Sequence, residues 1–325
     1  MTKSGKVLEL LRGSTACHSG EELATRLGIS RSAVWKQIEQ LRKVGYLIDG
    51  SPRLGYLLKG VPDEPVAEEI GARLPKSYPG EVLYYGSLAS SNDEAKRRAR
   101  AGAVAGTIIV AGQQTTGHGR LGREWLSPPG GLWLSVILRP QIALVKATRL
   151  AVVTAVVVAR ALEEMAQVRP AIKWPNDILL GDKKIAGILI EISAEMETLS
   201  YAVVGVGINA NLAADALPPS LAGTATSLLQ ATGRQVDRAH LAAAIGEGLL
   251  EASGKLYDEA MNDWISEWDS RSAALGKVVT VRGSGTDISG IAQGIDSDGC
   301  LLILTQEGGE VAVRLGEASL ELPGR

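Results

Sequence analysis

Two stretches of the chain place cationic side chains where they would suit an anionic ligand. In the first, three glycines within six residues lie beside two arginines, Arg120 and Arg123. Glycine lets a backbone approach a ligand closely, and planar guanidinium groups bind oxyanions through paired hydrogen bonds. In the second, Lys173 stands between apolar neighbours, where an ammonium group is costly unless it is paired or functional. These residue types predict a site for the phosphates of a nucleotide.

The glycine loop, Gly117-His118-Gly119-Arg120-Leu121-Gly122, matches G-x-G-x-x-G, which alone is a weak signal. It follows an apolar run at residues 107–111 that is typical of a buried strand. A dinucleotide-binding fold needs a helix that begins at the loop, but Pro128, Pro129 and the two glycines after them stop a helix here. This context disfavours a dinucleotide-binding fold. A flexible loop without a ligand is the alternative, and the two arginines argue against it.

Polar side chains that suit an uncharged part of a ligand lie elsewhere. Ser90, Ser91 and Asn92 begin a predicted helix after a strand at residues 82–85. Either serine is a natural helix cap, and the N-terminus of a helix also offers donors to a polar ligand. Trp125 suits stacking on a base, although a lone tryptophan is more often part of a core.

Charge is distributed unevenly along the 325 residues. The first 62 residues hold 10 Lys and Arg against 5 Asp and Glu, whereas the rest hold 24 against 31. A basic N-terminal segment on an acidic body is typical of a nucleic-acid-binding domain attached to another function. The length predicts two or three domains, and the 45% apolar content is sufficient for their cores.

The N-terminal segment has the pattern of a helix-turn-helix. Ser19 and Ser30 are predicted to cap successive helices, with Glu22 completing a capping box at the first and Gly28 forming the turn between them. A β-hairpin with Arg53 at its tip then forms a predicted wing. An alternative is a small protein-interaction domain with a charged surface, in which the tryptophan of the third helix packs internally. The residues predicted to contact DNA from that helix are Ser30, Arg31, Ser32, Trp35 and Lys36.

Cysteines and apolar runs indicate the compartment. Cys17 and Cys300 lie at opposite ends and form neither a disulfide framework nor a metal-binding spacing, which predicts a reducing cytoplasm. The three histidines are too scattered for a zinc cluster. No signal sequence is expected, and the run from Leu150 to Ala159 is too short to span a bilayer, which needs about 20 apolar residues. We therefore expect a cytoplasmic protein without a membrane partner.

The remaining pattern predicts three domains. An acidic linker with two prolines, at residues 61–65, follows the helix-turn-helix. Beyond it, apolar strands alternate with long helices, and Pro175 ends regular pairing beside Lys173, where Asn176 and Asp177 supply a turn. Four short strands with glycine-rich turns complete the chain. The long helices are predicted at residues 146–166, 237–254 and 256–272. The domains are a DNA-binding domain at 1–62, a catalytic domain at 66–272 and a small β domain at 273–325.

Four blocks of the second domain resemble, in order, the signature blocks of biotin–protein ligases. They lie at residues 117–125, 173–177, 184–191 and 205–209. With the N-terminal domain, the chain resembles the bifunctional form of this family, which is both ligase and repressor of the biotin operon. The resemblance implies an α+β multidomain fold with an N-terminal winged helix-turn-helix, a central mixed α/β domain of the class II synthetase-like (biotin/lipoate ligase) type, and a C-terminal SH3-like β-barrel.

The resemblance also implies an activity and a set of site residues. The family joins biotin to ATP as biotinyl-5′-AMP and passes biotin to a lysine in the biotin carboxyl carrier domain of a carboxylase, with Mg²⁺ on the phosphates. The implied catalytic residues are Lys173, Arg120 and Arg123. The implied biotin-binding residues are Ser90, Ser91, Asn92, Gln114, Gly117, His118, Gly119, Arg120 and Lys173. The implied residues for ATP and the adenylate are Arg120, Arg123, Trp125, Asn176, Lys184 and Asn209.

The same resemblance implies operator DNA as a partner and a homodimer when the adenylate is bound. One residue departs from the family pattern, because His118 stands where arginine is usual. A histidine is mostly neutral at pH 7. If this side chain helps to retain the adenylate, retention is weaker here; if only its backbone contacts biotin, little changes.

Other functions remain open at this stage. Lipoate ligation is the first, since the two ligase families are alike in their core, although the Lys-Trp-Pro-Asn-Asp block and the N-terminal domain favour biotin. A ligand-sensing repressor without transfer activity is the second, and the full set of Arg120, Arg123 and Lys173 argues against it. A third is that the N-terminal domain no longer represses and serves only as a tether.

Overall fold

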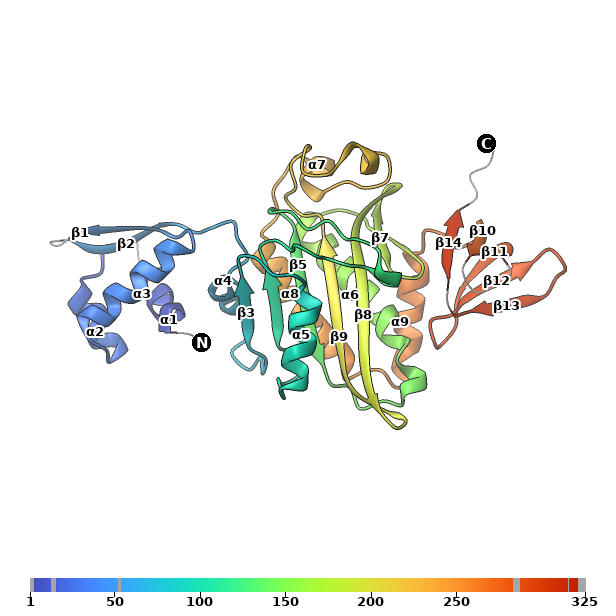
Figure 1. Cartoon of the computed structure of the whole chain (residues 1–325), viewed down its shortest axis with the longest axis horizontal. Coiled ribbons are helices and arrows are strands. Elements are labelled where there is room, and N and C mark those ends of the chain that lie inside the picture. Colours follow the sequence, from blue (N-terminus) through green and yellow to red (C-terminus); the bar gives the residue numbers. More distant parts are fainter. Residues whose placement is uncertain (1–2, 13–15, 52–53, 283–286, 315, 321–325) are drawn as a thin grey trace.

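The computed structural model describes residues 3–12, 16–51, 54–282, 287–314 and 316–320. Three bodies follow one another along the long axis of the molecule (Figure 1). A helical domain with a two-stranded sheet forms the N-terminal end, a seven-stranded sheet with helices forms the middle, and a five-stranded sheet forms the C-terminal end. Arg53, predicted at the tip of the wing, lies outside the described residues.

The N-terminal domain contains the predicted three helices and hairpin. Its elements are α1 (Lys3–Arg12), α2 (Gly20–Leu27), α3 (Arg31–Lys43), β1 (Leu47–Ser51) and β2 (Gly55–Gly60). The Ser19 and Ser30 hydroxyls accept backbone hydrogen bonds from the first turns of α2 and α3, at 3.0 and 3.2 Å, and Gly28 ends α2 with φ of 64°. The capping box is only half formed, because the Glu22 carboxylate bonds His18 Nδ1 at 2.9 Å.

A short helix that the sequence analysis did not predict joins this domain to the central body. It is α4 (Ala67–Arg73), whose preceding residue, Val66, belongs to the core of the N-terminal domain, while Ile70 belongs to the core of the central body. Its seven residues give too short a window for a periodic signal, and no side chain caps its start. The segment at α4 therefore packs into the cores of both domains.

The acidic linker before α4 is fixed to the central body. Arg238, which is 2% exposed, donates from Nη2 to Asp63 Oδ2 at 2.7 Å and from Nη1 to Gly131 O at 2.8 Å. Asn211 Nδ2 donates to Asp63 Oδ1 at 3.1 Å. The carboxylate thus binds two buried side chains of the central body, and the linker is not a free tether.

The central body is built on one mixed sheet. Its strands are β3 (Val82–Tyr85), β4 (Ile108–Ala111), β5 (Leu132–Leu138), β6 (Ala171–Lys173), β7 (Asp177–Leu180), β8 (Lys183–Glu195) and β9 (Thr198–Ile208). Their order is β3-β4-β5-β9-β8-β7-β6, with β3 and β4 parallel and all other neighbours antiparallel. Every residue of β4 and β5 is buried, which accounts for their continuous apolar sequence.

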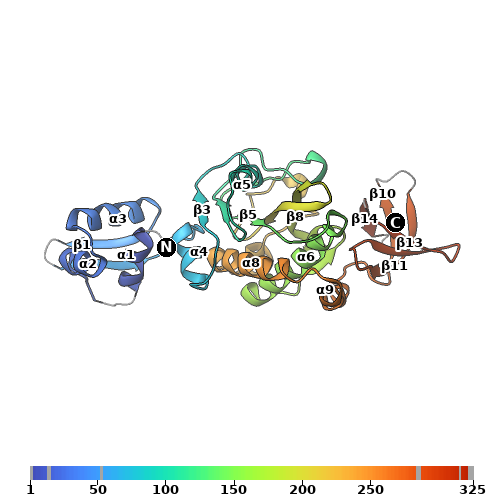
Figure 2. The same cartoon turned by 90° about the horizontal axis from the view of Figure 1, so that it is seen from below.

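Helices cover both faces of this sheet (Figure 2). α5 (Ser91–Arg100) packs on one face, and α6 (Arg149–Ala166) and α8 (Arg238–Ser253) pack on the other, followed by α9 (Asp258–Ser270). The predicted helix at 146–166 begins later than expected, after a 3₁₀ turn at Leu144–Lys146. α7 (Leu228–Thr232), capped by Ser227, was not predicted.

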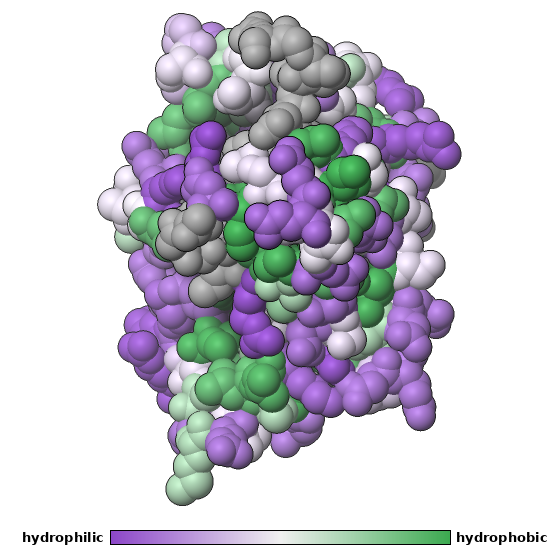
Figure 3. Space-filling view, turned by 90° about the vertical axis from the view of Figure 1, so that its right-hand side faces the viewer, coloured by the Kyte–Doolittle hydropathy of each residue, from purple (hydrophilic) through white to green (hydrophobic). Residues whose placement is uncertain are grey.

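The C-terminal body is a five-stranded antiparallel sheet in the order β13-β12-β11-β10-β14. These strands are β10 (Val278–Arg282), β11 (Ile288–Ile295), β12 (Leu301–Thr305), β13 (Glu310–Val313) and β14 (Glu317–Leu320). Four of them were predicted, and closure into an SH3-like barrel remains a prediction. Hydrophobic side chains are scattered among hydrophilic ones on the face that carries this body (Figure 3). Within the described residues, no helix is long and apolar enough to cross a membrane.

Candidate functional site

A pocket of about 280 Å³ lies between the loop at residues 113–127 and strands β5, β7, β8 and β9. It brings together side chains from stretches that are far apart in the sequence. The predicted ligand-binding residues that line it are Ser90, Ser91, Asn92, Gln114, His118, Gly119, Arg120, Arg123, Trp125, Lys173, Asn176 and Lys184.

At one end of the pocket, neighbouring residues fix the polar side chains. Gln114 Oε1 accepts a hydrogen bond from the Ser91 backbone N–H at 2.7 Å. Asn92, which is 4% exposed, accepts from Ser135 Oγ at 2.6 Å and donates to Glu191 Oε2 at 2.9 Å. Buried amides that are held in this way offer donors and acceptors in set positions. We call Ser91, Asn92 and Gln114 the amide end.

Two glycines of β9 make room for the pocket's side chains. A Cβ atom at Gly205 would lie 2.2 Å from Asn92 Oδ1, and one at Gly207 would lie 2.6 Å from Trp125 Nε1. Gly187 on β8 faces the same indole, where a Cβ would lie 2.9 Å from Trp125 Cζ3. Alternate residues of a strand share a face. The Gly-x-Gly spacing therefore places one glycine beneath the amide side chain and one beneath the indole.

Trp125 forms a flat, half-buried wall of the pocket. Its ring meets that of Trp133 edge-on, with centroids 6.5 Å apart, and Lys184 Nζ lies 4.8 Å from its centroid. The Trp125 Nε1 atom is buried and finds no acceptor among the described residues. An indole fixed on glycine is suited to stacking against a planar ligand.

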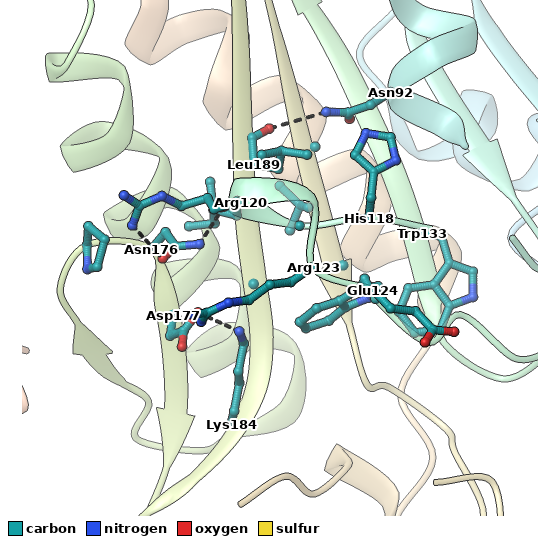
Figure 4. A pocket seen from close by; sticks show the side chains of 18 of the residues that line it. Asn92, His118, Arg120, Arg123, Glu124, Trp133, Asn176, Asp177, Lys184 and Leu189 are labelled. Atoms are coloured by element: carbon teal, nitrogen blue, oxygen red, sulfur yellow. Dashed lines mark hydrogen bonds and ion pairs between the residues drawn. The ribbon is translucent and has the colours of Figure 1, made fainter. Parts of the chain in front are cut away.

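The other end of the pocket is cationic. Lys173, at the end of β6, is half-buried, and its ammonium group has no hydrogen bond or ion pair with any described residue. Arg120 lies beside Asn176, with Nη1 3.3 Å from Oδ1, and Lys184 pairs with Asp177 at 2.6 Å (Figure 4). We call Arg120, Lys173 and Lys184 the cationic end. Figure 4 shows Asn92 on the side of the pocket away from Lys184.

His118 lies near two carboxylates, from Asp93 and Glu191, and one potential ligand atom of each of the three residues lies within 4.8 Å of the others. Lys96 Nζ lies 2.8 Å from both Asp93 Oδ1 and Glu191 Oε1, so an ammonium group already neutralises part of their negative charge. Burial opposes the charge on Lys96, but hydrogen bonds with both carboxylates outweigh it and raise the pKa of Lys96 above its ordinary value.

Two residues with predicted ligand roles do not line the pocket. Gly117 lies behind its wall, where a Cβ would meet Trp125 O at 2.5 Å. Asn209 is 4% exposed, and its Nδ2 donates to Thr226 O at 3.0 Å, which fixes the segment before α7. Both positions support neighbouring segments of the pocket wall.

The described residues predicted to contact DNA lie on the N-terminal domain, well separated from the pocket (Figure 1). Arg31, Ser32, Trp35 and Lys36 are all exposed along the first turns of α3, and Trp35 has 53% of its surface exposed. Trp35 therefore does not pack inside the domain and is available to a partner.

Several residues in or near the pocket carry no functional signal in the sequence. Lys96 and Glu191 are paired near His118, Ser135 orients Asn92, and Ala318 of the C-terminal body lines the pocket. Only Glu191 lay within a recognised block. Their partners come from other elements, so spacing along the chain carries no signal for them.

The pocket combines an end lined by neutral amides and hydroxyls with a cationic end. An unpaired ammonium group and guanidinium groups stabilise charge that develops on phosphate or carboxylate oxygens. The geometry therefore suits reactions in which two anions are joined.

Comparison with known proteins places the chain among ligases. Residues 88–209 match the biotin/lipoate A/B protein ligase family, residues 4–57 match an HTH domain, and residues 274–320 match the biotin protein ligase C terminal domain. The chain is 38% identical over 296 residues to the bifunctional ligase/repressor BirA of Bacillus subtilis, which covers 89% of this chain and 90% of that protein. It is 32% identical over 312 residues to BirA of Escherichia coli, covering 92% and 94%.

A solved structure shares the fold over most of the chain. The biotin protein ligase from Aquifex aeolicus in complex with biotin and ATP aligns with a TM-score of 0.64 and 32% identity. The alignment covers 74% of this chain and 98% of that one.

Proposed function

The chain belongs to the family of bifunctional biotin ligase/repressors, and from that premise we propose which residues of the pocket bind each substrate and what the N-terminal domain does. It is a biotin–[acetyl-CoA-carboxylase] ligase that uses ATP, and it is a DNA-binding repressor. The observation that carries the residue assignments is the unpaired, half-buried ammonium group of Lys173 opposite a fixed amide end.

The first step joins two anions. The carboxylate of biotin attacks the α-phosphorus of ATP, a bond to the bridging oxygen breaks, and pyrophosphate leaves. Cations aimed at the developing charge lower this barrier, and each counts for more where water is excluded. We assign Lys173 to the bridge between the carboxylate and the α-phosphate, and Arg120 and Arg123 to the adenylate and pyrophosphate.

The neutral head of biotin is assigned to the amide end. Ser90, Ser91, Asn92 and Gln114 would bind the ureido group, together with the backbone at residues 117–119. Their existing hydrogen bonds support this assignment, because each amide presents its remaining donor or acceptor in a set direction.

The nucleotide is assigned to the region around Trp125. Its ring would cover the adenine, with Asn176 and Lys184 nearby. Asn209 lies behind the pocket wall, so we assign it a supporting role: it holds the segment before α7 through its hydrogen bond to Thr226 O. Mg²⁺ is expected on the phosphates of ATP, where it would neutralise charge. The carboxylate of Asp177 also lines the pocket, where it pairs with Lys184.

In the second step, an acceptor lysine amine attacks the carbonyl of the mixed anhydride, and AMP leaves. We propose the biotin carboxyl carrier domain of a carboxylase as the acceptor, in keeping with the activity of the family. The acyl-adenylate is reactive, so proximity supplies much of the acceleration.

The N-terminal domain is assigned to biotin-responsive repression of the biotin operon. A single helix-turn-helix reads one half-site, so a two-fold operator requires two copies of the chain. We propose that the adenylate-bound chain forms this homodimer and that the adenylate orders the glycine loop, which favours the dimer by linkage. The cytoplasmic location predicted from the cysteines belongs to the same proposal.

The test is adenylate formation and transfer by the purified chain with ATP, biotin, Mg²⁺ and an acceptor domain. Labelled adenylate and labelled acceptor are expected. Lys173→Gln should lower the rate of adenylate formation by about 100-fold or more, as for loss of a group that stabilises transition-state charge. Lys183→Gln is the matched control, because Lys183 lies on β8 of the same sheet and its Nζ bonds Ala222 O outside the pocket.

Three results would contradict the proposal. Use of lipoate in place of biotin would indicate lipoate ligation. Stable adenylate without transfer would indicate a sensor. A Lys173→Gln variant with the wild-type rate would remove the cationic end from the chemistry.

A further inference from the structure

The strand that carries Lys173 lies against the C-terminal body. β6 forms one edge of the central sheet, and the segment leading to the C-terminal body covers that edge. The Ile172 N–H donates to Arg271 O at 2.8 Å, and the Ala273 N–H donates to Ile172 O at 2.8 Å. The residue before Lys173 is therefore fixed by the start of the connection to the last domain.

The residue after Lys173 is fixed by the C-terminal body itself. The indole of Trp174 is 4% exposed, and its Nε1 donates to Gly299 O at 3.2 Å. Gly299 belongs to a turn that Asp296 closes, since Asp296 Oδ1 accepts the N–H groups of Asp298 and Cys300, both at 2.9 Å. A closed turn presents its carbonyl in a fixed position.

This turn is wedged against the central body. Gly299 has a φ of +77°, and a Cβ there would lie 2.8 Å from Val152 Cγ2 on α6. Arg149, also on α6, reaches Asp298 Oδ1 with Nη2 at 3.5 Å. The close approach of α6 requires glycine at this position. The Gly299 carbonyl can accept the Trp174 hydrogen bond only while the turn keeps this contact with α6.

We propose that Trp174 is a positioning residue: its hydrogen bond to the Gly299 carbonyl couples the seating of the C-terminal turn to the placement of Lys173. The inference rests on the proposed function, in which the Lys173 ammonium meets the reacting phosphate. Small displacements of a charged group from reacting atoms lower rates steeply. The amide end is held by α5, β5 and β8, so it does not depend on this contact.

Trp174→Phe removes the N–H donor and keeps an aromatic ring. We expect the first-order rate of adenylate formation to fall about ten-fold, while the dissociation constant for biotin alone stays at the wild-type value. Trp264→Phe is the matched control, because Trp264 lies on α9 against Arg160 and does not line the pocket. Loss of folding would instead lower biotin binding and rate together.

Gly299→Ala tests the same contact from the other side. It should reproduce the slow adenylate step, and adding Val152→Ala, which removes the obstructing methyl group, should restore part of the rate. Gly308→Ala is its control, because Gly308 also has a positive φ, +83°, but nothing lies within 4 Å of its Cβ position. Trp174→Phe combined with Gly299→Ala should be little slower than either variant alone, as for two changes in one contact.

Amide hydrogen exchange separates this inference from the activity. In the full-length chain, Trp174→Phe and Gly299→Ala should speed exchange at residues 171–176 and leave residues 89–95 unchanged. A wild-type chain that forms no adenylate would contradict the proposed function, and the exchange result would still decide whether the turn holds this strand. A wild-type rate in Trp174→Phe, or equal behaviour of Gly299→Ala and Gly308→Ala, would overturn the positioning role.

Discussion

At the scale of single residues, the two ends of the pocket differ in how they are prepared for a ligand. Asn92 and Gln114 are already held by hydrogen bonds to neighbouring residues, so little side-chain order must be gained on binding. Lys173 has no partner among the described residues, and its charge is left for the ligand. We therefore expect changes at the amide end to alter which ligand binds, and changes at the cationic end to alter how fast it reacts.

His118→Arg should slow the release of the adenylate. A guanidinium group at this position reaches the carboxylates of Asp93 and Glu191 and carries a permanent charge. Exposed pairs of this kind contribute about 0.2–1 kcal/mol, so release should slow by up to about five-fold. The rate is measured by chasing labelled adenylate with unlabelled biotin and ATP.

His240→Arg is the control for this change, because His240 lies exposed on α8 away from the pocket. Unchanged release in His118→Arg would mean that only the backbone at this position matters.

Sequence alone predicted those residues that violate a local rule. Lys173 was identifiable because a lysine between apolar residues is unusual, and the arginines because they stand among glycines. Trp174 and Lys96 were assigned no role, since an aromatic residue or a lysine on a helix breaks no rule. Their roles depend on Gly299 and Glu191, which lie more than 90 positions away.

At the scale of elements, β9 carries one glycine beneath the amide end and one beneath Trp125, the positions proposed for biotin and for the adenine. Gly205→Ala would push Asn92 from its place, whereas Gly207→Ala would push Trp125. We expect the first change to weaken biotin binding and the second to weaken ATP binding, each about ten-fold or more, because overpacking typically costs about 1–3 kcal/mol.

Isothermal titration with each substrate separately measures both effects, and each variant is the control for the other. If both variants bound biotin and ATP equally weakly, the strand would tolerate no Cβ at either position, and the proposed separation of the two binding regions would be wrong.

The recognition helix α3 gives a second prediction at this scale. Trp35→Ala should lower affinity for a duplex selected by the wild-type chain about ten-fold and relax its sequence preference, because the exposed indole suits contact with base edges. Lys36→Gln should weaken binding to all sequences and lower the salt dependence by about one unit, as for a phosphate contact. Fluorescence anisotropy at several salt concentrations distinguishes them; equal loss of specificity in both would contradict the assignment.

Elements with a clear period or cap were predictable. The starts of α2 and α3 were predicted from the capping residues Ser19 and Ser30, and the buried strands from their continuous apolar sequence. α4 was missed because its stability comes from the two cores that it joins, and β14 because pairing with β10 defines it. In both cases tertiary contacts, not local sequence, decide the structure.

At the scale of the whole molecule, a buried carboxylate organises the joint between the N-terminal domain and the central body. Glu69 on α4 is 2% exposed and pairs with Arg12 of α1 and with Arg73, at 2.8 Å. The Tyr46 hydroxyl donates to Glu69 at 2.5 Å, and Arg73 also reaches Asp237 at the start of α8. Burial, together with the hydrogen bond to Glu69, raises the pKa of Tyr46 far above its ordinary value.

Glu69→Gln keeps the size of this side chain and removes its charge, which leaves Arg12 and Arg73 without their buried counter-ion. We expect the free energy of unfolding of the N-terminal domain to fall by about 2–3 kcal/mol, and adenylate formation to stay at the wild-type rate. Hydrogen exchange in α1 and α3 measures the first effect.

Glu247→Gln, at an exposed position on α8, is the control for that change. Protection of α1 and α3 at the wild-type level in Glu69→Gln would show that the joint does not depend on this charge.

The salt bridge between Asp63 and Arg238 has a consequence for how DNA would be read. Because the linker is clamped to the central body, the position of each recognition helix follows from the position of its own body. In an assembly of two chains, the distance between the two α3 helices would then be set by how the two central bodies associate. Asp63→Asn, which weakens the clamp, would broaden the range of half-site separations that are accepted before it changes the affinity for any one of them.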